Sequence, residues 1–144
     1  KLLTAFAAAS NEEVRIRALD LLGRNGVRTA FAPLVERVRR DAALRLSQRE
    51  ATAAGEAMAR CDPGRALELF REWLKPRGLF TSVLPGQSML QWVGVSGLVY
   101  LPGDEPEALI KHVADRAGSE LARHCTACMV KRRRVARGHV PGAP

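Results

Sequence analysis

The chain repeats part of itself without a gap, and this repetition limits what it can fold into. Residues 14–38 align with residues 50–74 at a constant offset of 36. Some matched positions are identical, as in Ala18/Ala54 and Arg24/Arg60, and core-type positions exchange within their class, as in Leu22/Met58, Gly23/Ala59, Leu34/Phe70 and Val38/Leu74. A period in the thirties with two apolar stripes per unit is typical of helical repeats, which bury their apolar faces by stacking. Such an array predicts a binding surface rather than a catalytic pocket.

Helix start and stop signals divide the chain into three predicted helical hairpins. These signals are Ser10 and Asn11, Asn25-Gly26, Ser47 with Glu50, and Asp62-Pro63. The predicted repeats span about residues 10–46, 47–86 and 87–117, and residues 76–86 form a longer connector. A capping helix over 118–133 and a disordered basic tail over 134–144 are expected to complete the fold. The predicted fold class is therefore all-α.

Three segments carry a resemblance to a known family. VRIRALDLLGRNG (14–26) and SQREATAAGEAMARCDPGRALELF (47–70) resemble bacterial HEAT repeats of the PBS-lyase HEAT-like type, and EPEALIKHVADRAGSELARHC (105–125) resembles the closing part of such arrays. The resemblance covers roughly residues 10–130. It implies a right-handed α-solenoid that serves as a non-catalytic scaffold or adaptor and binds a protein partner, without a cofactor.

The segment 78–103 contains no charged residue, which sets it apart from the two clear repeats. Its apolar part, residues 89–101, is too short to span a bilayer. One interpretation is a fully packed helix between the second repeat and the last helices, although Val-Gly-Val-Ser-Gly also tolerates extended structure. The other is an exposed patch that docks a partner or the N-terminal remainder of the same chain. The candidate protein-binding residues are Met89, Trp92, Val93 and Tyr100.

The net charge of +8 suggests an alternative function, binding of a nucleic-acid backbone or an anionic membrane surface. The balance is +5 in residues 1–49 (10 basic, 5 acidic), −2 in 50–117 (7 and 9) and +5 in 118–144 (6 and 1). The candidate anion-binding residues are Arg15, Arg17, Arg24, Arg28, Lys131, Arg132, Arg133 and Arg134. Ordinary solvated helix faces, or the codon bias of a GC-rich genome, explain many of these arginines equally well. Without interleaved aromatic residues, binding at 131–134 would be nonspecific and salt-dependent.

No catalytic or metal motif stands out. The three histidines, His112, His124 and His139, lack a motif context, and no glycine-rich phosphate loop is present. Cys125 and Cys128 lie one helical turn apart, which permits a metal or redox role, but structural zinc needs four ligands. Buried packing of these thiols is the favoured interpretation.

The sequence begins at Lys1, and residues 2–9 are already predicted to be the end of a helix. We therefore expect this chain to be part of a longer protein. Three cysteines do not form a disulfide framework of the extracellular kind, and no signal peptide is in view. The cytoplasm is the expected compartment.

Overall fold

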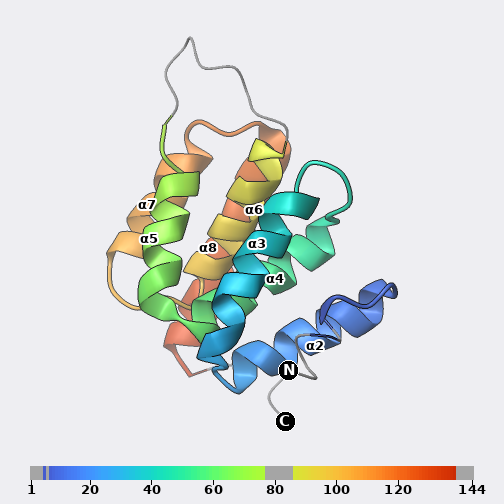
Figure 1. Cartoon of the computed structure of the whole chain (residues 1–144). Coiled ribbons are helices and arrows are strands. Elements are labelled where there is room, and N and C mark those ends of the chain that lie inside the picture. Colours follow the sequence, from blue (N-terminus) through green and yellow to red (C-terminus); the bar gives the residue numbers. More distant parts are fainter. Residues whose placement is uncertain (1–4, 6, 77–85, 139–144) are drawn as a thin grey trace.

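The computed structural model describes residue 5, residues 7–76 and residues 86–138, and the regular elements among them are all helical (Figure 1). The prediction of an all-α protein is confirmed. In chain order the elements are α2 (Glu12–Arg24), the 3-10 turn η1 (Arg28–Ala30), α3 (Phe31–Asp41), α4 (Gln48–Cys61), α5 (Pro63–Trp73), α6 (Gln87–Leu98), α7 (Glu105–Ala114) and α8 (Ser119–Ala136).

Local capping explains where α2, α4 and α5 begin. Asn11 rather than Ser10 caps α2, because the Asn11 side chain accepts hydrogen bonds from the amides of Glu13 and Val14. The hydroxyl of Ser47 accepts from the amide of Glu50 at the start of α4. Asp62 caps α5, in which Pro63 occupies the first position, where a missing amide is tolerated. The turn after α2 uses Gly26 at a φ of +57°, as the Asn-Gly pair predicts.

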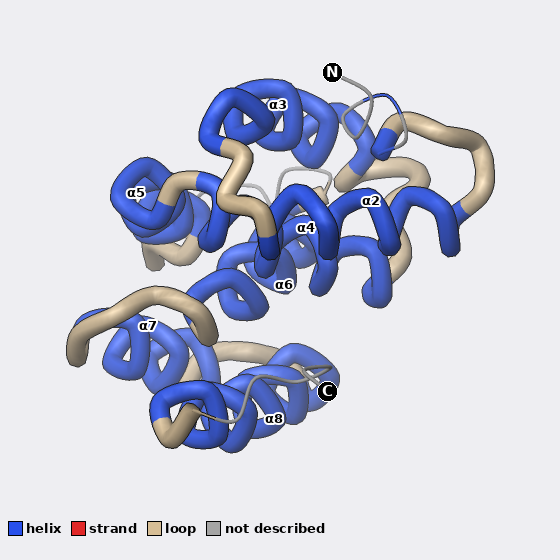
Figure 2. The backbone as a smooth tube through the Cα atoms, turned by 90° about the horizontal axis from the view of Figure 1, so that it is seen from below, coloured by secondary structure: helices blue, strands red, loops and turns tan. Residues whose placement is uncertain are grey.

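The helices pack as a central row with two helices on each side. The first helices of the successive hairpins form one row, because α2 packs on α4 and α4 packs on α6. Viewed along the molecule, α3 and α5 lie beside this row on one side, and α7 and α8 lie on the other (Figure 2). The helix α8 packs against α7 and α6. As a result, α4 and α6 are the helices with neighbours on most sides.

The offset of 36 seen in the sequence also relates equivalent buried positions. Helix α2 begins at Glu12 and α4 begins at Gln48, which is the same offset. Both members of each matched pair are buried at Ala18/Ala54, Leu19/Gly55, Leu22/Met58, Gly23/Ala59, Ala30/Ala66, Leu34/Phe70 and Val38/Leu74. The repeated residues are therefore those that form the core between neighbouring hairpins.

Helix α6 crosses α4 at two glycines. A Cβ atom on Gly55 would lie 2.1 Å from the carbonyl oxygen of Val93, and one on Gly97 would lie 2.6 Å from the carbonyl oxygen of Gly55. The two backbones approach this closely only because neither position carries a side chain. The Val-Gly-Val-Ser-Gly sequence, which is compatible with extended structure, is thus helical, and its Gly97 serves close helix packing.

A buried ion triad joins the first hairpin to α4. Glu50 is 3% exposed, and both its oxygens accept hydrogen bonds from Arg15, at 2.8 and 2.9 Å. Arg37 donates to the same carboxylate at 2.6 Å. Arg15 also donates to the backbone oxygens of Ala9 and Ser10, at 2.9 and 2.7 Å. The triad therefore ties α2, α3, α4 and the segment before α2 together.

Near the C-terminus the structure differs from the predicted division of the chain. The expected tail begins at Arg134, but α8 continues to Ala136. The C-terminal cations favour this longer helix, because positive charge stabilises the last turn. Most of the predicted connector, residues 77–85, and the end of the tail, residues 139–144, lie outside the described residues. Among the described helices, none combines the length and the apolar character needed to cross a membrane.

Candidate interaction groove

The structure places the predicted apolar binding residues in or against the core. Val93 is 0% exposed, while Met89, Trp92 and Tyr100 are half-buried. The Trp92 indole N–H donates to the hydroxyl of Thr52 at 3.0 Å. Because α6 packs against α4, α5, α7 and α8, this helix of the uncharged segment forms part of the interior of the domain. Val93 is therefore not accessible to a partner, and the packed-helix interpretation fits this segment.

A small polar cluster lies beside Trp92, between α6 and α8. The His124 ring stacks on Trp92 with centroids 3.8 Å apart and an interplanar angle of 9°. Its Nε2 lies 2.8 Å from the hydroxyl of Ser96 and 3.5 Å from the sulfur of Cys128. The Ser96 hydroxyl in turn donates to the Trp92 carbonyl at 2.8 Å. The sequence contained no motif for this cluster, because its two halves, Trp92 with Ser96 on α6 and His124 with Cys128 on α8, come together only through the packing of these helices.

The protonation states of this cluster do not suit nucleophilic chemistry near neutral pH. Burial, followed by the nearby charge of Lys131, lowers the pKa of His124 to about 4. Burial raises the pKa of Cys125 to about 11 and that of Cys128 to about 12. A thiol with such a pKa is inert, because the thiolate is the reactive form. Ser96 is also only 1% exposed, so we interpret the cluster as packing between α6 and α8.

The low pKa of His124 predicts an acid-sensitive contribution to stability. Because its folded pKa of about 4 lies below the ordinary value of 6.5, the unfolded chain binds more protons between these two values. The free energy of unfolding therefore falls as the pH is lowered through this window, and by pH 5 the loss should be about 1 kcal/mol after allowance for solvent screening. Urea denaturation at pH 7 and pH 5 should show a smaller loss in His124→Gln. His112→Gln, at an exposed position, should behave as the original chain; an unchanged pH dependence in His124→Gln would contradict the prediction.

The cysteines do not gather with other ligand-type residues. Cys61, Cys125 and Cys128 are free and buried, and the sulfur of Cys61 lies 3.5 Å from the carbonyl oxygen of Leu22. Within the residues that the structure describes, no group of three or more His, Cys, Asp or Glu side chains is placed to hold a metal ion. The pair His124 and Cys128 supplies two ligands, fewer than a structural zinc site uses.

Most of the predicted anion-binding residues interact with groups of the chain itself. Arg15 binds Glu50, Arg24 binds Asp20 at 2.9 Å, and Arg28 binds Asp62 at 3.2 Å. Lys131 binds Glu56. Arg132 donates to the carbonyl of Leu98 at 3.0 Å and also to that of Leu101, so it caps the end of α6. Arg17, Arg133 and Arg134 remain exposed. The proposed residues therefore do not converge on one site.

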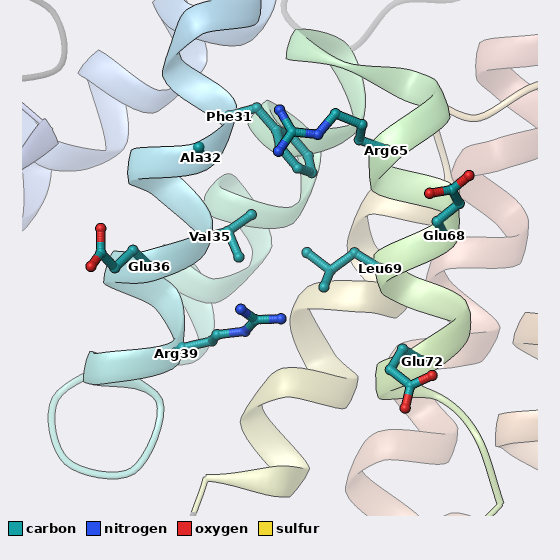
Figure 3. A pocket seen from close by; sticks show the side chains of 9 residues that line it. All are labelled: Phe31, Ala32, Val35, Glu36, Arg39, Arg65, Glu68, Leu69 and Glu72. Carbon is teal, nitrogen blue, oxygen red and sulfur yellow. The ribbon is translucent and has the colours of Figure 1, made fainter.

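A hollow that could receive a partner lies between α3 and α5. It has a volume of about 620 Å³. Along α3, Phe31, Val35 and Arg39 follow one another at intervals of four residues, and Val35 points across the groove toward Leu69 of α5 (Figure 3). Phe31 and Val35 are largely buried and Leu69 is half-buried. The two helices thus present an apolar floor along a shallow groove.

Charged side chains surround this floor. Arg65 lies over the Phe31 ring, with its guanidinium carbon 4.8 Å from the ring centroid. Arg39 extends into the gap at the other end of the groove (Figure 3). Three exposed carboxylates, Glu36 on α3 and Glu68 and Glu72 on α5, line its outer sides. Among the described residues, only Glu72 of these five charges forms an ion pair, with Lys75 at 3.3 Å.

Sequence reasoning did not identify this groove. The signal available in the sequence was the series Phe31, Val35 and Arg39, which runs along α3 beside the buried Leu34 and Val38. Whether such a row faces a neighbouring helix or a gap depends on the spacing of α3 and α5, which the pattern of one helix does not contain.

The groove and the fold are the structural findings that bear on function. Comparison of the chain with family models, with curated proteins and with solved structures finds no match in any of the three.

Proposed function

We propose that the chain is a non-catalytic protein-interaction module that binds a helical segment of a partner protein in the groove between α3 and α5. The observation that carries this proposal is the groove itself, with an apolar floor formed by Val35 and Leu69 and charges along its sides that, except for Glu72, form no ion pair within the described residues. An amphipathic helix laid into an apolar groove is a common mode of peptide recognition.

The packing of the helices supports a solenoid of HEAT-like hairpins as the scaffold for this function. The first helices α2, α4 and α6 stack in order, and the offset of 36 relates buried residues of the first two hairpins. The groove then lies between the second helices of adjacent hairpins, where a repeat array offers an extended surface. The absence of charged residues from α6 is consistent with its packing among α4, α5, α7 and α8, so in this proposal the third hairpin closes the array.

Charge complementarity identifies the chemistry of the partner. Glu36 lies along the outer side of α3, and Glu68 and Glu72 lie along α5 (Figure 3). A partner helix with an apolar stripe would cover Val35 and Leu69, and lysines or arginines on both flanks of that stripe would reach these carboxylates. Each such rim pair contributes up to about 1 kcal/mol and mainly sets specificity.

A pair of synthetic helical peptides tests this proposal by fluorescence anisotropy. Both carry the same leucine stripe, but one has lysines and the other has glutamates on its flanks. We expect the lysine peptide to bind about tenfold more tightly, because two rim pairs supply about 1.4 kcal/mol. Leu69→Glu should abolish binding, since it places a charge on the apolar floor. Glu36→Lys with Glu68→Lys should reverse the preference for the two peptides.

Two control variants separate the groove from general effects. Leu44 is 83% exposed and lies outside the groove, so Leu44→Glu should leave the affinity unchanged. The double variant Glu13→Lys with Glu107→Lys changes the net charge by the same amount as Glu36→Lys with Glu68→Lys, but its two residues lie outside the groove. Equal binding of the two peptides, or the same loss in the control variants, would overturn the assignment of the groove.

A further inference from the structure

The solvent-exposed face of α8 carries several arginines. Arg123, Ala127, Val130, Arg134 and Arg137 follow one another at intervals of four, three, four and three residues, which keeps them on one side of a helix. All five are exposed, as are the flanking Thr126 and Arg133. The opposite side of α8 holds the buried Cys125 and Cys128. We call Arg123, Arg133, Arg134 and Arg137 the α8 arginine face.

These four arginines differ from most other cations of the chain because no carboxylate compensates them. Within the described residues none of them forms an ion pair, and the guanidinium of Arg123 contacts only the carbonyl of Ser119, at 3.4 Å. The single acidic residue of α8, Glu120, accepts a hydrogen bond from Gln48 at 2.6 Å. By contrast, Lys131 and Arg132, on the inner side of the helix, bind Glu56 and the end of α6.

The helix dipole accounts for only part of this arrangement. Cations in the last turn of a helix are favourable, which explains Arg133 and Arg134 without a ligand. Arg123 lies in the second turn of α8, near the positive end of the dipole, where a cation gains nothing from it. The dipole therefore leaves Arg123, about 21 Å along the helix from Arg137, without an explanation.

From this geometry we propose that the α8 arginine face binds the phosphate backbone of a nucleic-acid duplex without sequence specificity. Arg133, Arg134 and Arg137 lie within about one helical turn of one another and Arg123 lies near the other end of the helix, so the face can contact phosphates at two places along a duplex. Each guanidinium group forms charge-assisted hydrogen bonds with a phosphate. Membrane binding is less well matched, because the apolar side of α8 is buried in the domain and Val130 is the single large apolar residue exposed on this face. No aromatic residue lies on the face for stacking of single-stranded bases.

This surface is independent of the groove between α3 and α5. Helices α3 and α8 lie on opposite sides of α4 and α6 (Figure 2). The peptide measurements described above do not involve the arginine face, and duplex binding does not involve the groove. Failure of either proposal therefore leaves the other intact.

Salt-dependent binding to duplex DNA tests the proposal. The probes are two fluorescein-labelled 20-base-pair duplexes of unrelated sequence, titrated with the chain from 50 to 200 mM NaCl. We expect equal affinity for both duplexes and a slope of log K against log salt of about −3 to −4, because each neutralised phosphate contributes about −0.9. The variant with Arg123, Arg133, Arg134 and Arg137 all replaced by Gln should lose at least about tenfold in affinity at 50 mM NaCl, and its slope should approach zero.

A matched variant controls for net charge. Replacing Arg17, Arg40, Arg45 and Arg49 by Gln removes the same four charges from exposed positions outside α8. This variant should retain most of the affinity and of the slope, and circular dichroism should show that both variants remain helical. Equal losses in the two variants would overturn the proposal, since binding would then follow total charge. Absence of duplex binding at 50 mM NaCl, or binding only to vesicles with 30% phosphatidylserine, would overturn it as well.

Discussion

Replacing Gly97 by alanine should destabilise the domain by about 3 kcal/mol or more, which is the upper part of the range for overpacked cores. The added methyl carbon would lie 2.3 Å from Cε2 of the Phe70 ring and 2.6 Å from the carbonyl oxygen of Gly55. Backbone atoms of α4 and the fully buried Phe70 ring of α5 surround the site, so the methyl group is accommodated only if α4 and the ring move away from α6. Gly55→Ala should have a similar effect, because its Cβ would lie 2.1 Å from the Val93 carbonyl. Urea denaturation followed by circular dichroism measures both losses.

Gly94 provides the matched control on the same helix. A Cβ there would contact the side chain of Leu74 at 3.4 to 3.5 Å, which is ordinary van der Waals distance. Gly94→Ala should therefore be neutral or stabilise the domain by up to about 1 kcal/mol through helix propensity. If Gly94→Ala and Gly97→Ala change the free energy of unfolding equally, the close crossing of α4 and α6 is not the origin of the effect.

Replacing Glu50 by glutamine should cost about 3 kcal/mol, at the low end of the range for breaking a buried ion pair. The carboxylate is 3% exposed and accepts hydrogen bonds from both Arg15 and Arg37, so its loss leaves two guanidinium groups without their counter-charge. The side chains of both arginines are 17% exposed, and this partial access to water keeps the cost from being larger. The free energy of unfolding at pH 7 measures the effect.

Glu13→Gln serves as the comparison for an exposed pair. Glu13 accepts from Arg49 at 2.7 Å, but both side chains are about two-thirds exposed, at 65% and 67%. This variant should change stability by less than about 0.5 kcal/mol. Repeating both measurements in 1 M NaCl should leave the Glu50 effect largely intact, because salt screens buried charges weakly. A cost for Glu50→Gln as small as that for Glu13→Gln would show that the triad does not stabilise the fold.

The features of this fold that the sequence predicts are the local ones. Asn11, Ser47 and Asp62 cap helices, and Gly26 turns the chain after α2, because each acts on backbone groups within a few residues. The repeat likewise predicts which residues are buried, since equivalent positions face equivalent neighbours. These signals require no knowledge of how distant helices are arranged.

The features that escaped prediction depend on that arrangement. An uncharged segment is compatible with a buried helix and with an exposed patch, and the packing of α4, α5, α7 and α8 around α6 distinguishes them. The groove between α3 and α5 arises from the spacing of two helices. Arg132 belongs to a basic run in the sequence, but its role as a cap of α6 depends on carbonyl groups about thirty residues earlier in the chain.

The position of α6 affects how this protein folds during synthesis. Its uncharged surface is covered on one side by α4 and α5, which precede it in the chain, and on the other by α7 and α8, which follow it. During synthesis α6 therefore emerges before half of its cover exists, and exposed apolar surface in an unfinished chain favours aggregation. The carbonyl groups at the end of α6 also lack their hydrogen-bond donor until Arg132 of α8 has been synthesised. Chaperone dependence should accordingly be greatest for nascent chains that end between α6 and α8.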